Sequence, residues 1–160
     1  MKEALTVLLL IIGVLAVRGA LSLSRQIRLK KHWKRAQEAL REEDLDSAAA
    51  ALRRCISLMP LWVMARGTLG VILARQGKLD EAEEQLKLAA ELQPRRPEGF
   101  VELGLFYALH CEGREDDAIG AFVNAAEHAP ELAEQIRRDP RLKHLHAHSR
   151  FGEIAAAASG

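Results

Sequence analysis

Cysteine and aromatic residues are scarce in this chain of 160 residues, which has two Cys, two Trp, one Tyr and four Phe. The two cysteines show neither a disulfide framework nor metal-ligand spacing, and they fit a reducing compartment. The chain also lacks a Gly-rich phosphate loop, a Ser-His-Asp grouping and a paired-carboxylate motif. These absences predict that the protein is not an enzyme and holds no cofactor.

The residues that are abundant favour helices. Apolar residues make up 49% of the chain, and Ala and Leu dominate among them. Ala, Leu, Glu, Arg and Lys are the best helix formers, and most of the five prolines and eleven glycines fall where helices would end. We therefore predict an all-α fold.

Charge is divided unevenly along the chain. Residues 1–35 carry eight Lys or Arg and one Glu, whereas residues 36–160 carry fifteen basic and twenty-one acidic residues. Because contact with phosphates needs a basic surface, the acidic body predicts no nucleic-acid partner.

An apolar run at residues 4–17 precedes the basic segment at residues 25–35. The run would be about 21 Å long as a helix, and extending it through Ser24 gives about 31 Å, enough for a bilayer core. No A-x-A cleavage site follows, so residues 1–24 are predicted to be a transmembrane signal anchor rather than a cleaved signal peptide. The basic flank predicts binding to the membrane surface and a single-pass protein with a cytoplasmic C-terminal domain.

The body repeats with a period of 34 residues. Leu45-Asp46 recurs as Leu79-Asp80, and Pro60 recurs as Pro94. A third copy, two residues longer, ends at Pro130. Small residues recur where two helices of one repeat would approach closely, with Leu residues filling the spaces between them.

This pattern of Leu-Gly, Tyr, Ala, Phe, Ala and Pro resembles the tetratricopeptide repeat, a helix-turn-helix unit of 34 residues. The resemblance implies an α-solenoid of about three repeats with C-terminal capping helices, and the layout is similar to that of bacterial inner-membrane repeat proteins. Glu43 stands where the family usually has Gly. The implied segments are a degenerate first repeat at 29–62, further repeats at 63–96 and 97–130, capping helices at 131–154 and a flexible tail at 155–160.

In this family the first helix of each repeat lines a concave groove that binds peptides or partner helices. The resemblance implies a protein-binding groove lined by Lys30, Trp33, Lys34, Gln37, Arg41, Met64, Thr68, Val71, Arg75, Glu98, Val101, Glu102 and Leu105. The expected function is a membrane-anchored adaptor or scaffold that recruits a protein segment to the membrane surface in the assembly or regulation of a membrane complex. The alternative is a self-assembling homo-oligomer, in which a second protomer or the protein's own cap fills the apolar strip of the groove.

Histidines 144, 146 and 148 form the remaining cluster with potential chemistry. His144 and His148 would share one face of a helix, but no acidic or thiol ligand lies beside them in sequence. Cys55 occupies a small-residue packing position, and Cys111 lies in the insertion of the third repeat. We expect no metal site, and a metal- or redox-dependent regulator is the weakest of the three functional hypotheses.

Overall fold

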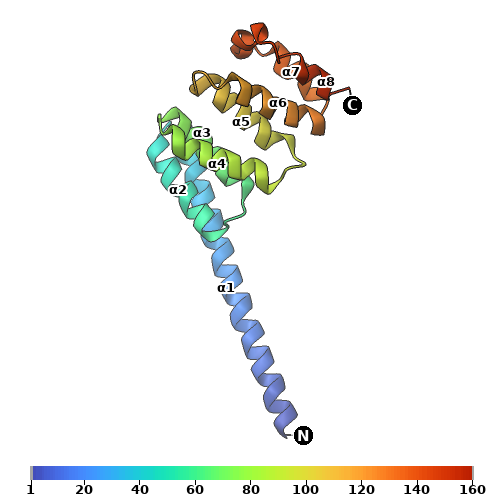
Figure 1. Ribbon diagram of the computed structural model, residues 1–160. Coiled ribbons are helices and arrows are strands. Elements are labelled where there is room, and N and C mark those ends of the chain that lie inside the picture. Colours follow the sequence, from blue (N-terminus) through green and yellow to red (C-terminus); the bar gives the residue numbers. More distant parts are fainter. Residues whose placement is uncertain (1, 160) are drawn as a thin grey trace.

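The computed structural model describes the backbone of residues 2–159 and the side chains of residues 11–159, and every regular element in this part of the chain is helical (Figure 1). The predicted all-α fold is therefore confirmed. The elements are α1 (Lys2–Arg41), α2 (Leu45–Leu58), α3 (Val63–Arg75), α4 (Leu79–Leu92), α5 (Pro97–His110), α6 (Glu115–His128), α7 (Glu131–Arg138), the 3-10 helix η1 (Pro140–Ala147) and α8 (Glu153–Ala157).

The helices form antiparallel pairs that stack along the chain. The helix α1 packs on α2, α3 on α4 and α5 on α6, and neighbouring pairs meet through α2 with α3 and α4 with α5. The second helix of each pair ends two residues before Pro60, Pro94 or Pro130. Proline has no backbone N–H to donate and disfavours helical backbone in the residue before it, so each proline stops its helix.

Tight turns join the two helices of each pair, and each turn contains one residue in the left-handed region. These residues are Glu43, with φ of 57°, Gly77, with φ of 74°, and Gly113, with φ of 75°. Glycine adopts this conformation without steric cost, whereas a residue with a Cβ atom is strained there. The first repeat therefore keeps the turn geometry of the others although it lacks the glycine.

Replacing Glu43 with Gly is expected to raise the free energy of unfolding by about 0.5–1 kcal/mol, because relief of left-handed strain outweighs the added freedom of the unfolded chain. Urea unfolding followed by circular dichroism measures the change. Glu42→Gly is the matched control, since Glu42 is exposed in the same turn but has no positive φ. The control is expected to destabilise slightly, and equal shifts in both variants would contradict the interpretation.

Glycines on the first helix of a pair allow close packing against large side chains of the second. A Cβ atom added at Gly70 would lie 2.5 Å from Cγ of Leu86, and one added at Gly104 would lie 2.5 Å from Cε1 of Phe122. Leu86 and Phe122 are both completely buried. Close small-residue contacts are thus present within the second and third repeats, where the bulky partner fills the space above the glycine.

Glu83 on α4 links the second and third repeats. Its Oε1 accepts hydrogen bonds from the Tyr107 hydroxyl at 2.8 Å and from Nη2 of Arg114 at 3.2 Å, and it pairs with Nζ of Lys87 at 2.7 Å. The Arg114 guanidinium also stacks over the Tyr107 ring, 4.6 Å from its centroid. These contacts connect α4 to α5 and to the start of α6.

The elements α7, η1 and α8 cover the end of the repeat array (Figure 1). The buried side chains Ile136, Leu142, Leu145 and Ile154 join the main core. In the segment 131–154, where capping helices were predicted, the chain forms α7, the 3-10 helix η1 and the start of the short α8.

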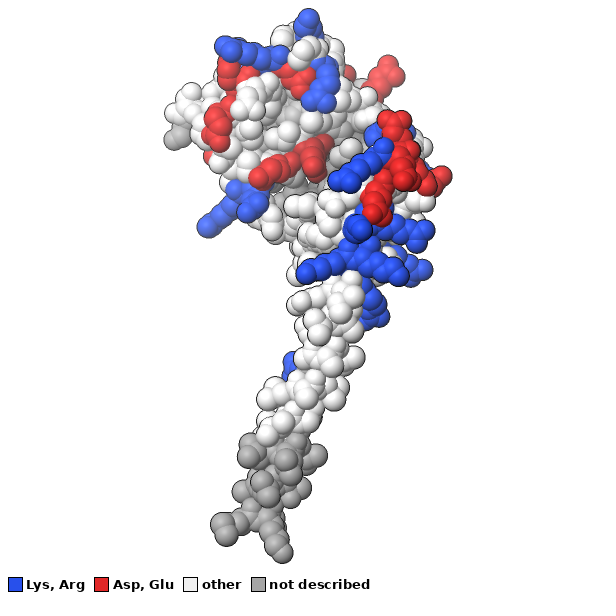
Figure 2. All heavy atoms as spheres, turned by 180° about the vertical axis from the view of Figure 1, so that it is seen from behind, with Lys and Arg blue, Asp and Glu red and all other residues white. Residues whose placement is uncertain are grey.

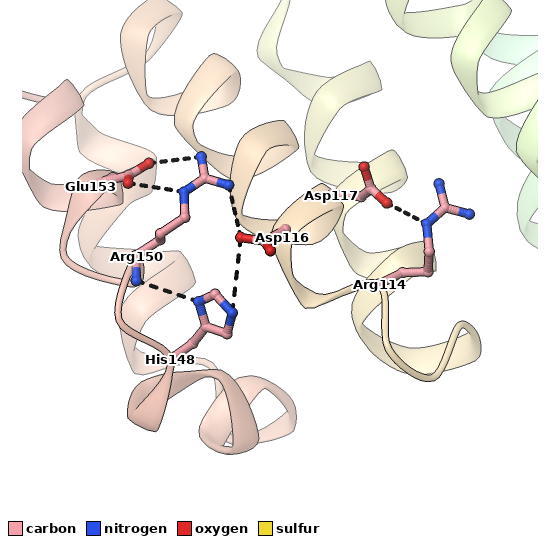
Figure 3. Close-up of polar contacts among 6 residues, drawn as sticks. All are labelled: Arg114, Asp116, Asp117, His148, Arg150 and Glu153. Carbon is pink, nitrogen blue, oxygen red and sulfur yellow. Dashed lines mark hydrogen bonds and ion pairs between the residues drawn. The ribbon is translucent and has the colours of Figure 1, made fainter.

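An ion-pair cluster fixes this cap to α6 (Figure 3). Nη1 of Arg150 donates to Asp116 at 2.9 Å, and the same guanidinium binds Glu153 at 2.9 Å. Nε2 of His148 lies 3.9 Å from the Asp116 carboxylate. The polar side chains around Asp116 therefore hold the end of the chain onto the third repeat.

The prediction of a membrane anchor, and with it of a single-pass protein with a cytoplasmic body, was wrong: within the described residues, no helix combines the length and the apolar character that a membrane span requires. The first part of the predicted anchor, residues 1–10, lies outside the described side chains. From Ile11 onward, Arg18, Arg25 and Arg28 interrupt the apolar sequence of α1.

Candidate concave binding site

A hollow of about 590 Å³ opens between the N-terminal parts of α3 and α5. The connection between α2 and α3 forms one wall, and the end of α4 contributes the base. The residues that line it are Met59, Leu61, Trp62, Val63, Met64, Thr68, Ala89, Gln93, Arg96, Glu98, Gly99 and Glu102. Its walls are thus apolar on the side of the α2–α3 connection and acidic on the side of α5.

Two arginines hold the apolar connection in place. Arg66 Nε donates to the Pro60 carbonyl at 2.8 Å, and its Nη1 donates to Gln85 Oε1 at 2.7 Å. Arg25 on α1 donates from Nε to the Leu58 carbonyl at 2.6 Å. These bonds satisfy the carbonyl groups of Leu58 and Pro60, and the neighbouring Leu61 side chain is 71% exposed.

Two glycines allow the acidic wall to lie close to its neighbours. A Cβ atom added at Gly99 would lie 2.9 Å from Cα of Ala90, so α5 begins almost in contact with the backbone of α4. On the other side, the Glu102 carboxylate lies so close to Gly67 that a Cβ atom at Gly67 would overlap Oε2. Backbone proximity at these two glycines thus places Glu102 between α5 and α3.

The Glu102 carboxyl group has a raised pKa. Burial is the larger cause, and the neighbouring charge of Glu98 adds to it. Across the described part of the chain, no side-chain hydrogen bond and no cation acts on the Glu102 carboxylate, and no ion pair involves Glu98. Arg96, the other charged residue of the lining, is exposed and precedes the first turn of α5. The site therefore contains a half-buried negative charge without a partner among the described residues.

The structure distributes the predicted groove residues over different surfaces. Met64, Thr68, Glu98 and Glu102 line the hollow. Val101 and Leu105 instead line a smaller hollow of about 200 Å³, together with residues of α7 and η1. The cap thus lies beside the apolar strip that was predicted to face a ligand.

The remaining predicted residues lie outside both hollows, on α1 and on the second half of α3. Lys34 pairs with Glu38 at 3.5 Å. Trp33 is half-buried, with its ring centroid 4.8 Å from that of Trp62. The other side chains of this set are exposed, namely Lys30, Gln37, Arg41, Val71 and Arg75.

Sequence reasoning missed the apolar connection between α2 and α3 as part of the site. Met59, Leu61 and Met64 are 40%, 71% and 59% exposed, and all three line the hollow, so they form an exposed apolar cluster. The signal in the sequence was the run from Leu58 to Met64, which has no charged residue although it joins two repeats. Connections are normally polar because they face water, so an apolar connection indicates a contact surface.

The histidine and cysteine residues do not assemble into a chemical site in the described part of the chain, where no group of three or more potential metal ligands occurs. His148 is the residue that ends η1, and it faces Asp116 rather than His144. Burial raises the pKa of both the Cys55 and the Cys111 thiols, which opposes formation of the reactive thiolate.

Comparison with known families gives one match. A model of the tetratricopeptide repeat matches residues 34–99 and again residues 68–134, which together cover α2 to α6 and the flanking turns. A search of curated proteins finds no match to the chain.

Proposed function

Because this chain belongs to the tetratricopeptide repeat family, we propose that it is a protein-interaction scaffold whose hollow between α3 and α5 binds a segment of a partner protein. Repeats of this family are protein-binding modules. The observation that carries the proposal is the exposure of Met59, Leu61 and Met64 beside a hollow of about 590 Å³. Exposed apolar side chains that cluster at a concavity are typical of a recognition site.

The lining supports binding rather than covalent chemistry. It contains no Ser, Cys, His or Lys, and the hydroxyl of Thr68 donates to the Met64 carbonyl at 2.8 Å rather than to a base. Its volume accommodates a few side chains of an extended segment or one turn of a helix. The hydrogen-bonded connection and the packed helices around it are already arranged, so binding requires little ordering of the protein.

Site-specific photocrosslinking in the cell that produces the protein tests this proposal. With p-benzoylphenylalanine in place of Leu61, irradiation is expected to give a discrete adduct of higher mass, whose partner is identified by mass spectrometry. The same crosslinker in place of Leu109 is the matched control, since Leu109 is a 40% exposed apolar residue outside the hollow. The Leu61 adduct is expected to disappear when Met64→Lys places a charge in the apolar wall.

Equal adducts at positions 61 and 109, or a Leu61 adduct that survives Met64→Lys, would contradict binding at the hollow. The side chains of Leu61, Met64 and Leu109 are all exposed, so none of the three substitutions disturbs the core.

Self-assembly is the second candidate function, and a different surface favours it. The stem, defined as residues 11–27 of α1, projects from the helical body, and its large apolar side chains are 51–63% exposed (Figure 1). Lys and Arg side chains gather where the stem meets the body (Figure 2). Adducts that contain only copies of this chain would establish self-assembly in place of a scaffold for other proteins.

A further inference from the structure

We propose that the hollow recognises a Lys or Arg side chain in the partner segment together with a bulky apolar residue next to it. The cation is received by the Glu102 and Glu98 carboxylates, and the apolar residue packs against the wall formed by Leu61 and Met64. This inference rests on the proposed function, and it specifies the chemistry of the segment that the scaffold binds.

The position of Glu102 supplies the first step of the argument. Its carboxylate is half-buried over Gly67, where a side chain at position 67 would displace it. Burial of an ionised carboxylate without a hydrogen-bond or ion-pair partner costs free energy, and a ligand cation would recover that cost. A glycine at position 67 thus leaves room for the carboxylate and exposes its open side to the hollow.

Glu98 supplies the second step. It lies one helical turn before Glu102 on α5 and lines the same hollow, where its charge raises the pKa of the Glu102 carboxyl group. Two carboxylates on one wall repel each other, and they also repel an anionic ligand. A cation shared by the two carboxylates relieves their mutual repulsion. Arg96 also lines the hollow, but it is exposed and pairs with neither carboxylate among the described residues.

The opposite wall selects the neighbouring residue. Trp62 and Met64 line the hollow across from α5 and offer an aromatic and a flexible thioether surface. The aliphatic stem of Lys or Arg packs well on such surfaces while its charged end reaches a carboxylate. Leu61, the most exposed of these apolar side chains, is positioned to cover a bulky residue adjacent to the cation in the partner.

The test uses a random dodecapeptide library displayed on phage and selected against the immobilised full chain. Selection is repeated against Glu102→Gln, against Leu61→Ser with Met64→Ser, and against Glu91→Gln as a matched control on the exposed surface of α4. We expect wild type and Glu91→Gln to enrich peptides in which Lys or Arg adjoins a bulky apolar residue. Glu102→Gln is expected to lose this enrichment, and an enriched peptide is expected to bind that variant at least ten-fold more weakly.

A double-mutant cycle on one enriched peptide measures the coupling directly. Replacing its basic residue with norleucine is expected to weaken binding to wild type at least ten-fold but binding to Glu102→Gln much less, because the carboxylate partner is already absent. Equal losses against both proteins would overturn the assignment of the cation to Glu102.

The other outcomes separate this inference from the proposed function. Enriched peptides that depend on Leu61 and Met64 but show no basic residue would overturn the cation site and leave the scaffold function intact. If no enriched peptide depends on Leu61 and Met64, both are overturned. Self-association of the full chain that is abolished by Glu102→Gln would show that the occupant is a second copy, against the inference of a separate partner.

Discussion

Phe122→Ala is expected to lower the free energy of unfolding by about 3–5 kcal/mol, a large part of the stability of a domain of this size. The Phe122 side chain is completely buried on α6 and fills the space above Gly104 of α5. Removing the ring leaves a cavity at the centre of the third repeat that the packed helices cannot fully close. Urea unfolding followed by circular dichroism gives the change.

Gly104→Ala tests the same contact from the opposite side. A Cβ atom there would lie 2.5–2.9 Å from three atoms of the Phe122 ring, so we expect destabilisation of about 1–3 kcal/mol. Gly120→Ala is the matched control, since a Cβ atom at this helical glycine meets nothing within 4 Å. The control is expected to stabilise by about 0.5–1 kcal/mol.

Combining Gly104→Ala with Phe122→Leu is expected to cost less than the sum of the two single changes, because the smaller side chain makes room for the methyl group. If Gly104→Ala behaved like Gly120→Ala, the close approach of α5 to Phe122 would not be a determinant of stability.

Glu83→Gln is expected to lower the free energy of unfolding by about 1–2 kcal/mol at pH 7, a value reduced for the partial exposure of the group. Hydrogen bonds from Lys87, Tyr107 and Arg114 lower the pKa of the Glu83 carboxyl group to about 2, whereas its ordinary value is 4.5. The variant keeps an acceptor for Tyr107 but loses the charge that attracts the two basic side chains. The loss of stability in this variant therefore measures the contribution of the ionic contacts that join α4, α5 and α6.

The pH dependence of this effect has a defined direction. A carboxyl group with a lowered pKa in the folded state stabilises the protein fully above the ordinary pKa of 4.5, and the contribution is lost as the pH falls towards 2. The difference between wild type and Glu83→Gln is thus expected to shrink by more than half between pH 7 and pH 3. Glu84→Gln, at an exposed position on α4, is the control and is expected to change stability by less than about 0.5 kcal/mol at either pH. A difference for Glu83→Gln that stayed constant with pH would contradict the assignment.

The fold could be predicted from the sequence because its signals are local. Helix-forming composition, left-handed glycines at positions 77 and 113, and a proline after every second helix each act on a few neighbouring residues. Their recurrence every 34 residues indicated a repeat protein, and the match to the tetratricopeptide repeat model agrees with this prediction. The wrong prediction of a membrane anchor shows the limit of such reasoning. It was based on a short apolar run, whereas the helix that contains this run, α1, continues to Arg41 and includes several Arg residues.

The candidate site was predicted only in part. The groove was implied by the resemblance to the tetratricopeptide repeat, and four of its residues, Met64, Thr68, Glu98 and Glu102, line the hollow. The same resemblance assigned Val101 and Leu105 to the ligand surface, although the cap lies beside them. A family alignment indicates which helices line the groove, but it does not indicate which other segment of this chain lies beside them.

The sequence by itself determined that the chain is helical, where α2, α4 and α6 end, how the helices of the repeats pair, and which small residues permit the pairs to pack. Only the tertiary structure decided that an apolar connection forms a wall of the hollow, that Gly67 accommodates the Glu102 carboxylate, and that Glu43 adopts a left-handed turn without glycine. The physical reason is the range of the interactions involved. Hydrogen bonding and backbone sterics act over a few residues, whereas burial and exposure depend on segments that are distant in sequence and meet only after the repeats have stacked.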